Sequence, residues 1–285
     1  MQLGFSTMNT PDDLRPDRLA VELEARGYDS LWVGEHSHIP ASRLTPYPSG
    51  GELPSQYVRM MDPFVSLALA ASATRGLLLG TGVCLPLEHD LFQLAKKVAT
   101  LDLLSGGRVL FGVGVGWNEE ELANHRPRVP WKRRYGALEE CVAALRTLWA
   151  DADAEFHGEH FDFDPVWSYP KPAQRPHPPI LVGSAGRVGT AQTVKWGDEW
   201  MPMDVALGNV AKKIGLFREA AAEAGRDDIA ITIVAFGDPT PDTLHAYREL
   251  GVKRVVLGAA RTGWADPATT MPFVERYTSH IAELA

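Results

Sequence analysis

The sequence has little cysteine, a deficit of basic residues and no long apolar run, and each absence excludes a class of protein. Two cysteines, Cys84 and Cys141, are too few for a disulfide scaffold, so we expect reduced core thiols in a cytoplasmic protein. A net charge of −8 argues against a nucleic-acid or anionic-membrane surface. No apolar stretch is long enough to span a bilayer, and residues 1–13 lack the pattern of a signal peptide, so we expect no membrane partner and no leader.

What the sequence has instead is a repeating unit, in which an amphipathic segment is followed by a glycine and then by a short apolar run. The predicted helical segments are 20–26, 67–75, 92–104, 135–149, 188–195, 210–224, 244–250 and 273–284. The predicted strands are 3–6, 31–33, 77–80, 109–113, 180–182, 199–201, 229–236 and 255–257. Helices that alternate with strands indicate a parallel sheet, and about eight such units in 285 residues favour a single (β/α)8 TIM barrel spanning residues 1–285.

Two irregular stretches interrupt the repeat. Residues 40–59 follow the second strand and are rich in proline, glycine and serine, so they predict a mobile lid at the catalytic face. Residues 151–179 are rich in aromatics and proline and predict a packed excursion.

The segment 77–121 is the most informative part of the chain because two strands in succession end in glycine-rich turns. The first ends in Thr81, Gly82 and Val83, and the second ends in Gly114 and Gly116. Glycine at the carboxyl end of a parallel strand lets a ligand approach the backbone closely. The two turns therefore predict a cofactor across the mouth of the barrel.

Polar residues follow other strands at the same end. Glu35 and His36 lie just beyond the second strand, and an imidazole there could act as a general acid or base. Asn118 precedes three glutamates and is a good helix N-cap, which is compatible with a second role at a ligand. A phosphate site is predicted where the run 180–182 opens a helix, at Gly183, Ser184, Ala185, Gly186 and Arg187.

Seven segments together carry a resemblance to a known family. They are DSLWVGEH (29–36), LGTGV (79–83), ATLDLLSGGR (99–108), GVGVGWNE (112–119), YPKP (169–172), PPILVGS (178–184) and GDEW (197–200). The chain resembles luciferase-like monooxygenases, and is most similar to the actinobacterial branch that uses coenzyme F420, a deazaflavin. The resemblance covers nearly the whole chain.

The resemblance implies an oxidoreductase that transfers hydride between F420 and a small organic substrate. It places a non-prolyl cis peptide at Gly82–Val83, forming a bulge behind the cofactor ring, and gives His36 the role of general acid or base. It places Glu35, where relatives often carry Asp, against the ring or the histidine. It further implies that Gly114 and Gly116 admit the cofactor, that Asn118 reaches it, and that 183–187 hold its phosphate. Trp117 and the loop 40–59 would shape the substrate pocket, and a homodimer is usual in such a family.

Other functions remain open at this point. The nearest is an FMN-dependent monooxygenase, which would receive reduced flavin from a reductase. A barrel that carries the cofactor without catalysis is another. The pair His36 and His38 also has the form used by metallohydrolase barrels, but His89 and His125 do not fall at matching strand ends, so we expect no metal. Val115 stands where some sugar-phosphate dehydrogenases of the superfamily carry a catalytic Glu, which argues against their chemistry.

Overall fold

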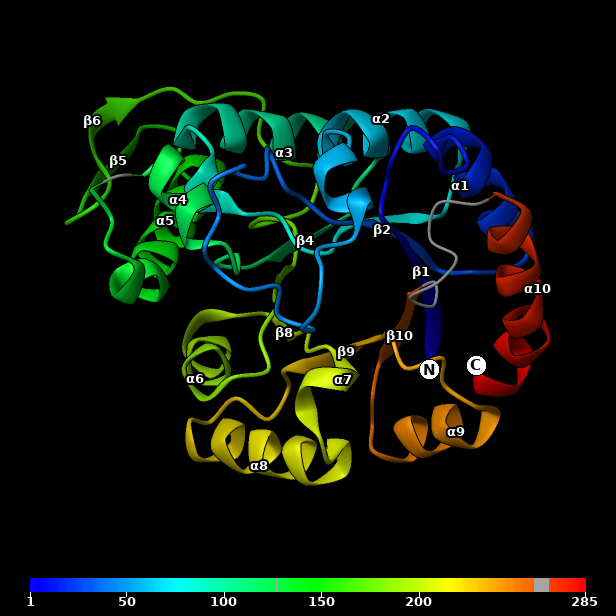
Figure 1. Cartoon of the computed structure of the whole chain (residues 1–285). Coiled ribbons are helices and arrows are strands. Elements are labelled where there is room, and N and C mark those ends of the chain that lie inside the picture. Colours follow the sequence, from blue (N-terminus) through cyan, green and yellow to red (C-terminus); the bar gives the residue numbers. More distant parts are fainter. Residues whose placement is uncertain (127, 259–266) are drawn as a thin grey trace.

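The computed structural model describes residues 1–126, 128–258 and 267–285. Within these residues, eight parallel strands close into a barrel in the order β1-β10-β9-β8-β7-β4-β3-β2, with helices around it (Figure 1), which confirms the TIM-barrel prediction. The barrel strands are β1 Gln2–Thr7, β2 Ser30–Val33, β3 Leu78–Thr81, β4 Val109–Val113, β7 Ile180–Val182, β8 Glu199–Trp200, β9 Ala230–Ala235 and β10 Arg254–Gly258.

The α-helices follow the strands in the expected alternation. They are α1 Pro16–Ala25, α2 Pro63–Ala73, α3 Leu91–Ser105, α4 Glu119–His125, α5 Arg134–Ala150, α6 Arg187–Trp196, α7 Asp204–Leu207, α8 Val210–Glu223, α9 Pro241–Glu249 and α10 Pro267–Leu284. Short 3-10 turns stand at η1 Ser55–Arg59, η2 Pro86–Glu88 and η3 Trp131–Arg133. Capping explains some of these bounds: the Asp90 side chain accepts from the amide of Gln93 to begin α3, and Gly106 ends it in the left-handed conformation.

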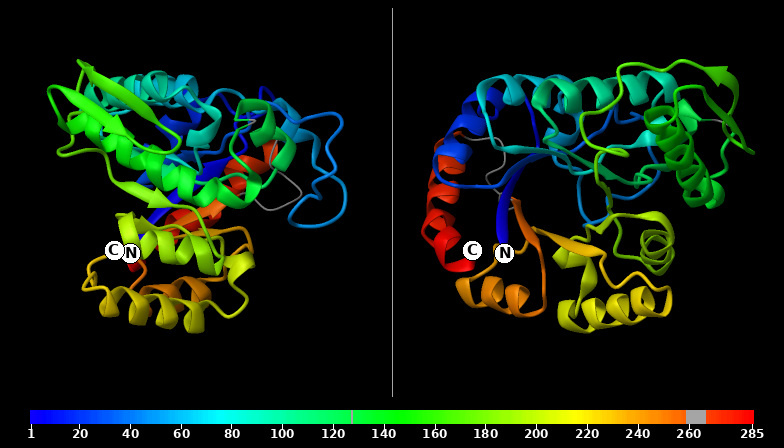
Figure 2. Two further views of the ribbon diagram at one scale, coloured as in Figure 1. Left: turned by 90° about the vertical axis from the view of Figure 1, so that its left-hand side faces the viewer. Right: turned by 180° about the vertical axis from the view of Figure 1, so that it is seen from behind.

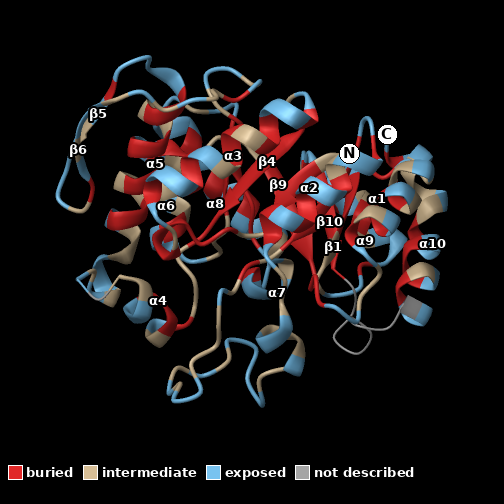
Figure 3. Ribbon diagram, turned by 90° about the horizontal axis from the view of Figure 1, so that it is seen from above, coloured by how far each residue is buried: buried red, intermediate tan, exposed pale blue. Residues whose placement is uncertain are grey.

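The strands are buried on both faces, as continuous apolar runs predict. Figure 3 shows them red between helices whose outer faces are exposed. Their inward residues form a small inner core that includes Trp32. A Cβ added at Gly80 would lie 2.2 Å from the Trp32 ring, so glycine in β3 makes room for this indole. The outward residues pack against the helices in the main core.

The two irregular stretches differ in kind. Residues 151–179 contain an antiparallel hairpin, β5 Ala154–His157 and β6 Asp162–Val166, whose Phe163 ring packs against Phe92 and Phe156, so this excursion is packed as predicted. Residues 40–59 form turns and η1 over the mouth of the barrel. The mobility of this loop stays a prediction.

Three further observations concern the chain ends, the cysteines and the helices. The α-amino group of Met1 donates to the carbonyl of Leu284, so the two ends of the chain lie side by side (Figure 2). Cys84 and Cys141 are free and buried, as expected. In the part of the chain that the structure describes, no helix has both the length and the apolar character to cross a bilayer.

Candidate active site

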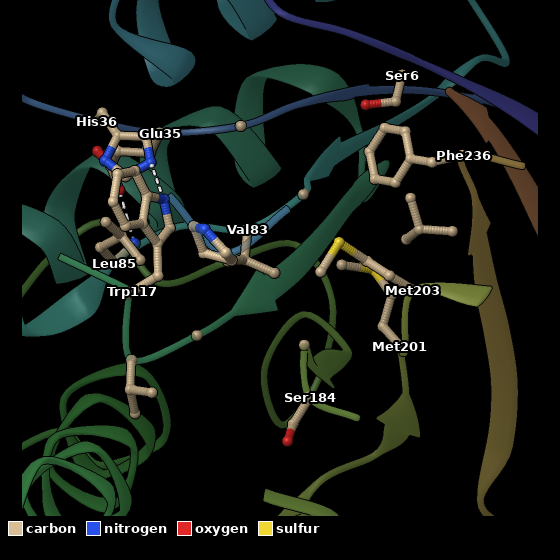
Figure 4. Close-up of a pocket in the computed structure, with 18 of the residues that line it drawn as sticks. Ser6, Glu35, His36, Val83, Leu85, Trp117, Ser184, Met201, Met203 and Phe236 are labelled. Atoms are coloured by element: carbon tan, nitrogen blue, oxygen red, sulfur yellow. Dashed lines mark hydrogen bonds between the residues drawn. The ribbon is translucent and has the colours of Figure 1, made fainter. Parts of the chain in front are cut away.

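A cavity of about 390 Å³ opens at the carboxyl ends of the barrel strands. Figure 4 shows its two sides, with His36, Glu35 and Trp117 on one, Met201, Met203 and Phe236 on the other, and Val83 between them. The lining comes mostly from the carboxyl ends of β1 and β9, from the segments after β1, β2, β3, β4, β7, β8 and β9, and from the loop 40–59. Ligand sites of this fold lie at this face.

The floor of the cavity is the segment Gly82–Val83, whose peptide bond is cis as the resemblance implied. The side chain of Val83 lies between two neighbouring strand ends. A Cβ at Gly114 would stand 2.7 Å from one methyl group of Val83, and a Cβ at Gly183 would stand 2.4 Å from the other. These two glycines therefore make room for the side chain of Val83. The sequence interpretation had given them a role in cofactor binding only.

His36 is the central polar group of the wall. Its Nδ1 lies 2.7 Å from Oε2 of Glu121, and its Nε2 accepts a hydrogen bond from the Trp117 indole at 3.0 Å. Because the indole can only donate, Nε2 carries the lone pair and Nδ1 carries the proton, which it donates to the carboxylate. The imidazole side chain is 7% exposed, and Nε2 is the atom on the Trp117 side of the ring.

Glu35 lines the cavity but does not orient His36. Its Oε2 accepts from the amide of Leu85 at 2.7 Å, and its Oε1 lies 2.7 Å from Nε2 of His89. Burial disfavours the charged carboxylate, but the hydrogen bonds from His89, Leu85 and Cys84 outweigh it and hold the pKa of Glu35 below its ordinary value. Of the two roles that the resemblance offered Glu35, orienting the histidine belongs to Glu121 in this structure.

A further buried carboxyl, that of Glu88, lies near Glu121 and His125. Burial, together with the negative charges of Glu121 and Glu35, raises the pKa of Glu88 to about 10, so Glu88 carries a proton at neutral pH. Oε2 of Glu88 and Oε1 of Glu121 are both buried and have no hydrogen-bond partner among the described residues. A proton shared between the two carboxyls would satisfy both atoms.

The predicted phosphate site, residues 183–187, lies at the start of α6. Gly183, Ser184, Ala185 and Gly186 line the cavity, whereas Arg187 is exposed and does not. Gly186 is the N-cap and provides no side-chain hydrogen bond, so the first amides of α6 have no side-chain cap. The Ser184 hydroxyl turns away, since a Cβ at Gly189 would stand 1.8 Å from its Oγ.

The loop 40–59 covers the cavity with aromatic side chains. Tyr47 and Tyr57 line it and pack edge-on against Trp117, with ring centroids 6.0 and 6.1 Å from that indole. The carboxylate of Glu120 fastens the loop to α4 by accepting from the amides of Leu44 and Thr45.

Not every predicted residue lies at the cavity. Thr81 is buried, and its hydroxyl donates to the carbonyl of Gly112. Asn118 is 1% exposed, and its Oδ1 caps α4 through the amide of Glu121, so the helix-cap interpretation is confirmed. The remaining predicted residues line the cavity: Glu35, His36, Gly82, Val83, Gly114, Gly116, Gly183, Ser184, Ala185 and Gly186.

Sequence reasoning missed the buried carboxyls and histidines around His36. Glu121 is one of the three glutamates that follow the predicted N-cap Asn118, and the sequence alone does not connect it, Glu88, His89 or His125 with His36. The only available signal was the presence of buried carboxyls in apolar stretches such as Leu85–Leu87. The apolar wall formed by Met60, Met201, Met203, Val205, Val234 and Phe236 was also missed.

One group of side chains has the composition of a metal site. Atoms of Glu35, Cys84 and His89 lie within 4.8 Å of one another. The Glu35 oxygens are already engaged with the Leu85 amide and with His89, and burial raises the pKa of Cys84 well above its usual value, so the thiol keeps its proton. Hydrogen bonding accounts for this arrangement without an ion.

Comparison with known proteins agrees with the barrel fold. The family model described as luciferase-like monooxygenase matches residues 7–277. An uncharacterized protein of Mycobacterium tuberculosis is 39% identical over 99% of both chains. An F420-dependent hydroxymycolic acid dehydrogenase of the same organism is 28% identical, over 79% of this chain and 59% of that protein.

Two solved structures share the fold. A monooxygenase, RslO1 from Streptomyces bottropensis, superimposes with a TM-score of 0.76 at 23% identity over 99% of both chains. An F420-dependent secondary alcohol dehydrogenase in complex with an F420-acetone adduct superimposes with a TM-score of 0.74 at 19% identity, over 100% of this chain and 99% of that one.

Proposed function

Because this chain belongs to the luciferase-like monooxygenase family, we propose that it is an oxidoreductase that transfers hydride between coenzyme F420 and a small organic substrate with an apolar body. The observation that carries the proposal is the imidazole of His36, held by Glu121 in one tautomer beside a largely apolar cavity. A buried general acid or base of this kind suits the interconversion of an alcohol and a carbonyl compound.

The residues at the barrel mouth fit a flavin-like cofactor. Gly82 and Val83 form a floor without polar side chains on which a planar ring can lie, and the uncapped amides of α6 suit a phosphate. Gly183 to Gly186 would hold that phosphate through backbone groups, and Arg187 at the helix start would add positive charge. When bound, the deazaflavin supplies hydride transfer at its C5 atom.

In the reaction, the protein itself would contribute the imidazole of His36 on one side of the cavity and the apolar side chains on the opposite side. Nε2 of His36 would exchange a proton with the substrate oxygen once the Trp117 indole releases it. Glu121 stabilises the imidazolium that forms through a charge-assisted hydrogen bond. The methionines and Phe236 on the opposite wall would exclude water and favour an apolar substrate.

A titration of the purified protein with F420 and, separately, with FMN tests the proposal. Trp117 lines the cavity, so quenching of tryptophan fluorescence reports binding, and Trp117→Phe is the matched control for that signal. Tight binding of F420 with weak binding of FMN supports the proposal. Binding of neither cofactor would refute the phosphate site at 183–187.

The second candidate is an FMN-dependent monooxygenase with a reductase partner, and the structural similarity to the Streptomyces bottropensis monooxygenase supports it. Tight FMN binding, with oxygen consumed in the presence of reduced flavin, would favour it over hydride transfer. A barrel that binds a cofactor without catalysis predicts binding but no turnover on any alcohol or ketone tested.

We also propose a cytoplasmic homodimer. Helix α2, Pro63–Ala73, has no charged residue, although Val65 is 71% exposed and Leu69 is 38% exposed. Helix α3 lies beside α2 (Figure 1). Its Leu104 is 80% exposed. Since exposed apolar side chains that gather on neighbouring helices are normally covered, the α2–α3 face suits a second copy of the chain.

A further inference from the structure

We propose that Glu121, Glu88 and His125 form a proton path that leads from His36 through the protein to the surface beside His38. The path begins where Nδ1 of His36 donates to Glu121 across 2.7 Å. It continues to Glu88 on η2, and Oε2 of Glu88 lies 4.0 Å from Nε2 of His125 at the end of α4. It leaves the cavity on the side of His36 opposite to Trp117.

The two carboxyls are built to hold one proton between them. The Glu121 side chain is 1% exposed and that of Glu88 is 4% exposed, so neither can be solvated by bulk water. Each has one buried oxygen without a partner among the described residues. The charge of Glu121 acts directly on Glu88, and a single proton shared between the two carboxyls removes the repulsion and satisfies both oxygens.

The outer end of the path reaches solvent through three side chains. Nε2 of His125 lies 2.6 Å from the hydroxyl of Ser37, and that hydroxyl lies 2.9 Å from Nδ1 of His38. Ser37 is exposed, and the His125 side chain is 29% exposed. Burial, with a contribution from His38, lowers the pKa of His125, so this imidazole is largely neutral at pH 7 and can accept a proton.

Each transfer along the path balances. When His36 takes a proton at Nε2, its Nδ1 proton passes to Glu121. As Glu121 passes that proton to Glu88, Glu88 gives up its own to Nε2 of His125, which releases one to solvent. One proton enters at Nε2 and one leaves to solvent. Both carboxyls return to their starting states, and His36 is left with its proton on Nε2. In the reverse sequence a proton from solvent reaches Nδ1 as Nε2 gives its own to the substrate oxygen, which restores the Nδ1–H tautomer.

The longest step is the 4.0 Å between Glu88 and His125, which exceeds hydrogen-bond distance and requires the imidazole to rotate. The groups that face Glu88 come from three directions. Glu121 and His125 lie on α4, Glu35 follows β2, and Cys84 and His89 flank η2. Arg126, at the end of α4, donates to the carbonyl of His89, and its positive charge helps to lower the pKa of His125.

The use of the path in catalysis rests on the proposed function, but the path itself can be tested without cofactor or substrate. NMR of the 15N-histidine-labelled protein reports the Nδ1 proton of His36 and its rate of exchange with water. Glu88→Gln keeps the size and hydrogen-bonding capacity of the side chain but cannot relay a proton. We expect this exchange to slow by about tenfold or more while the resonance keeps its position. Glu119→Gln, an exposed residue of the same helix, is the matched control and should leave the rate unchanged.

A second variant keeps the test decisive if Glu88→Gln does not fold. His125→Phe removes the accepting nitrogen at the partly exposed end of the path and should also slow the exchange. A structural role alone would leave exchange unchanged or make it faster through loosening, and either result in a folded variant overturns the proposal. Failure of F420 to bind would refute the proposed function and leave this result standing.

Discussion

The indole N–H of Trp117 and the carboxylate of Glu121 hold the two nitrogens of His36 from opposite sides. The indole donates to Nε2 at 3.0 Å, and Glu121 accepts from Nδ1 at 2.7 Å. Both contacts favour the same tautomer, with the proton on Nδ1. The nitrogen that faces the cavity is therefore the one with a free lone pair once the indole moves.

The relative weight of the two contacts can be measured. A hydrogen bond to an ionised acceptor is roughly twice as strong as a neutral one, so Glu121 should dominate. We expect Trp117→Phe to leave His36 in the Nδ1–H tautomer and Glu121→Gln to give a mixture, as read from the 15N shifts of both ring nitrogens. If Trp117→Phe alone scrambled the tautomer, the indole and not the carboxylate would be the group that orients His36.

Removal of the imidazole tests its role in proton transfer. His36→Ala should lower kcat by about 10²- to 10⁴-fold, the usual contribution of a positioned acid or base, while the Kd for F420 changes little. The matched control is His245→Ala on α9, which contributes no residue to the cavity. Unchanged turnover in His36→Ala would show that another group moves the proton.

Gly183 can be required for cofactor binding or for making room for the side chain of Val83, and a double-mutant cycle separates these two reasons. A Cβ there would stand 2.4 Å from Val83, so Gly183→Ala should destabilise the protein by about 1–3 kcal/mol in urea denaturation. Val83→Ala should recover part of that loss in the double variant, because it removes the clashing methyl groups. The control Gly136→Ala places its Cβ in open space on α5 and should stabilise by up to about 1 kcal/mol. Additive effects of the two substitutions would show that the valine does not explain the glycine.

The α2–α3 face predicts the oligomeric state. Val65→Asp places a charge on an exposed position of α2 and should convert a dimer into a monomer, as measured by light scattering after size exclusion. The matched control is Val188→Asp, which is 54% exposed on α6. A wild-type protein that is monomeric at every concentration would contradict the proposal.

The fold was accessible from the sequence because its signals are local. The runs 109–113 and 180–182 are strands with the predicted bounds, since short continuous apolar runs bounded by turn residues are typical of strands buried on both faces. The pairing of His36 with Glu121 was not accessible, because 85 residues separate them and the cap of α4 already explained the glutamate. The role of Gly183 was hidden for the same reason: only the closed barrel brings it against Val83.

The protonated state of Glu88 makes a prediction about stability. Its pKa is raised from 4.5 to about 10 in the folded protein, so the folded state binds more protons than the unfolded state between these values. The contribution of Glu88 to the free energy of unfolding is therefore complete below pH 4.5 and is lost as the pH rises towards 10. The loss can be no steeper than about 1.4 kcal/mol per pH unit for one group.

Glu88→Gln separates this group from the others that titrate. The variant cannot ionise, so the difference in unfolding free energy between Glu88→Gln and the wild type should move in favour of the variant as the pH rises from 5 to 9. Glu35 titrates in the opposite sense, because its lowered pKa gives stability that is lost only as the pH falls below about 4.5, and it cancels in the difference. Urea denaturation of both proteins across this range provides the measurement. A difference that does not change with pH would mean that Glu88 is ionised in the folded protein, and the pair with Glu121 would then lack the proton that the path to the surface requires.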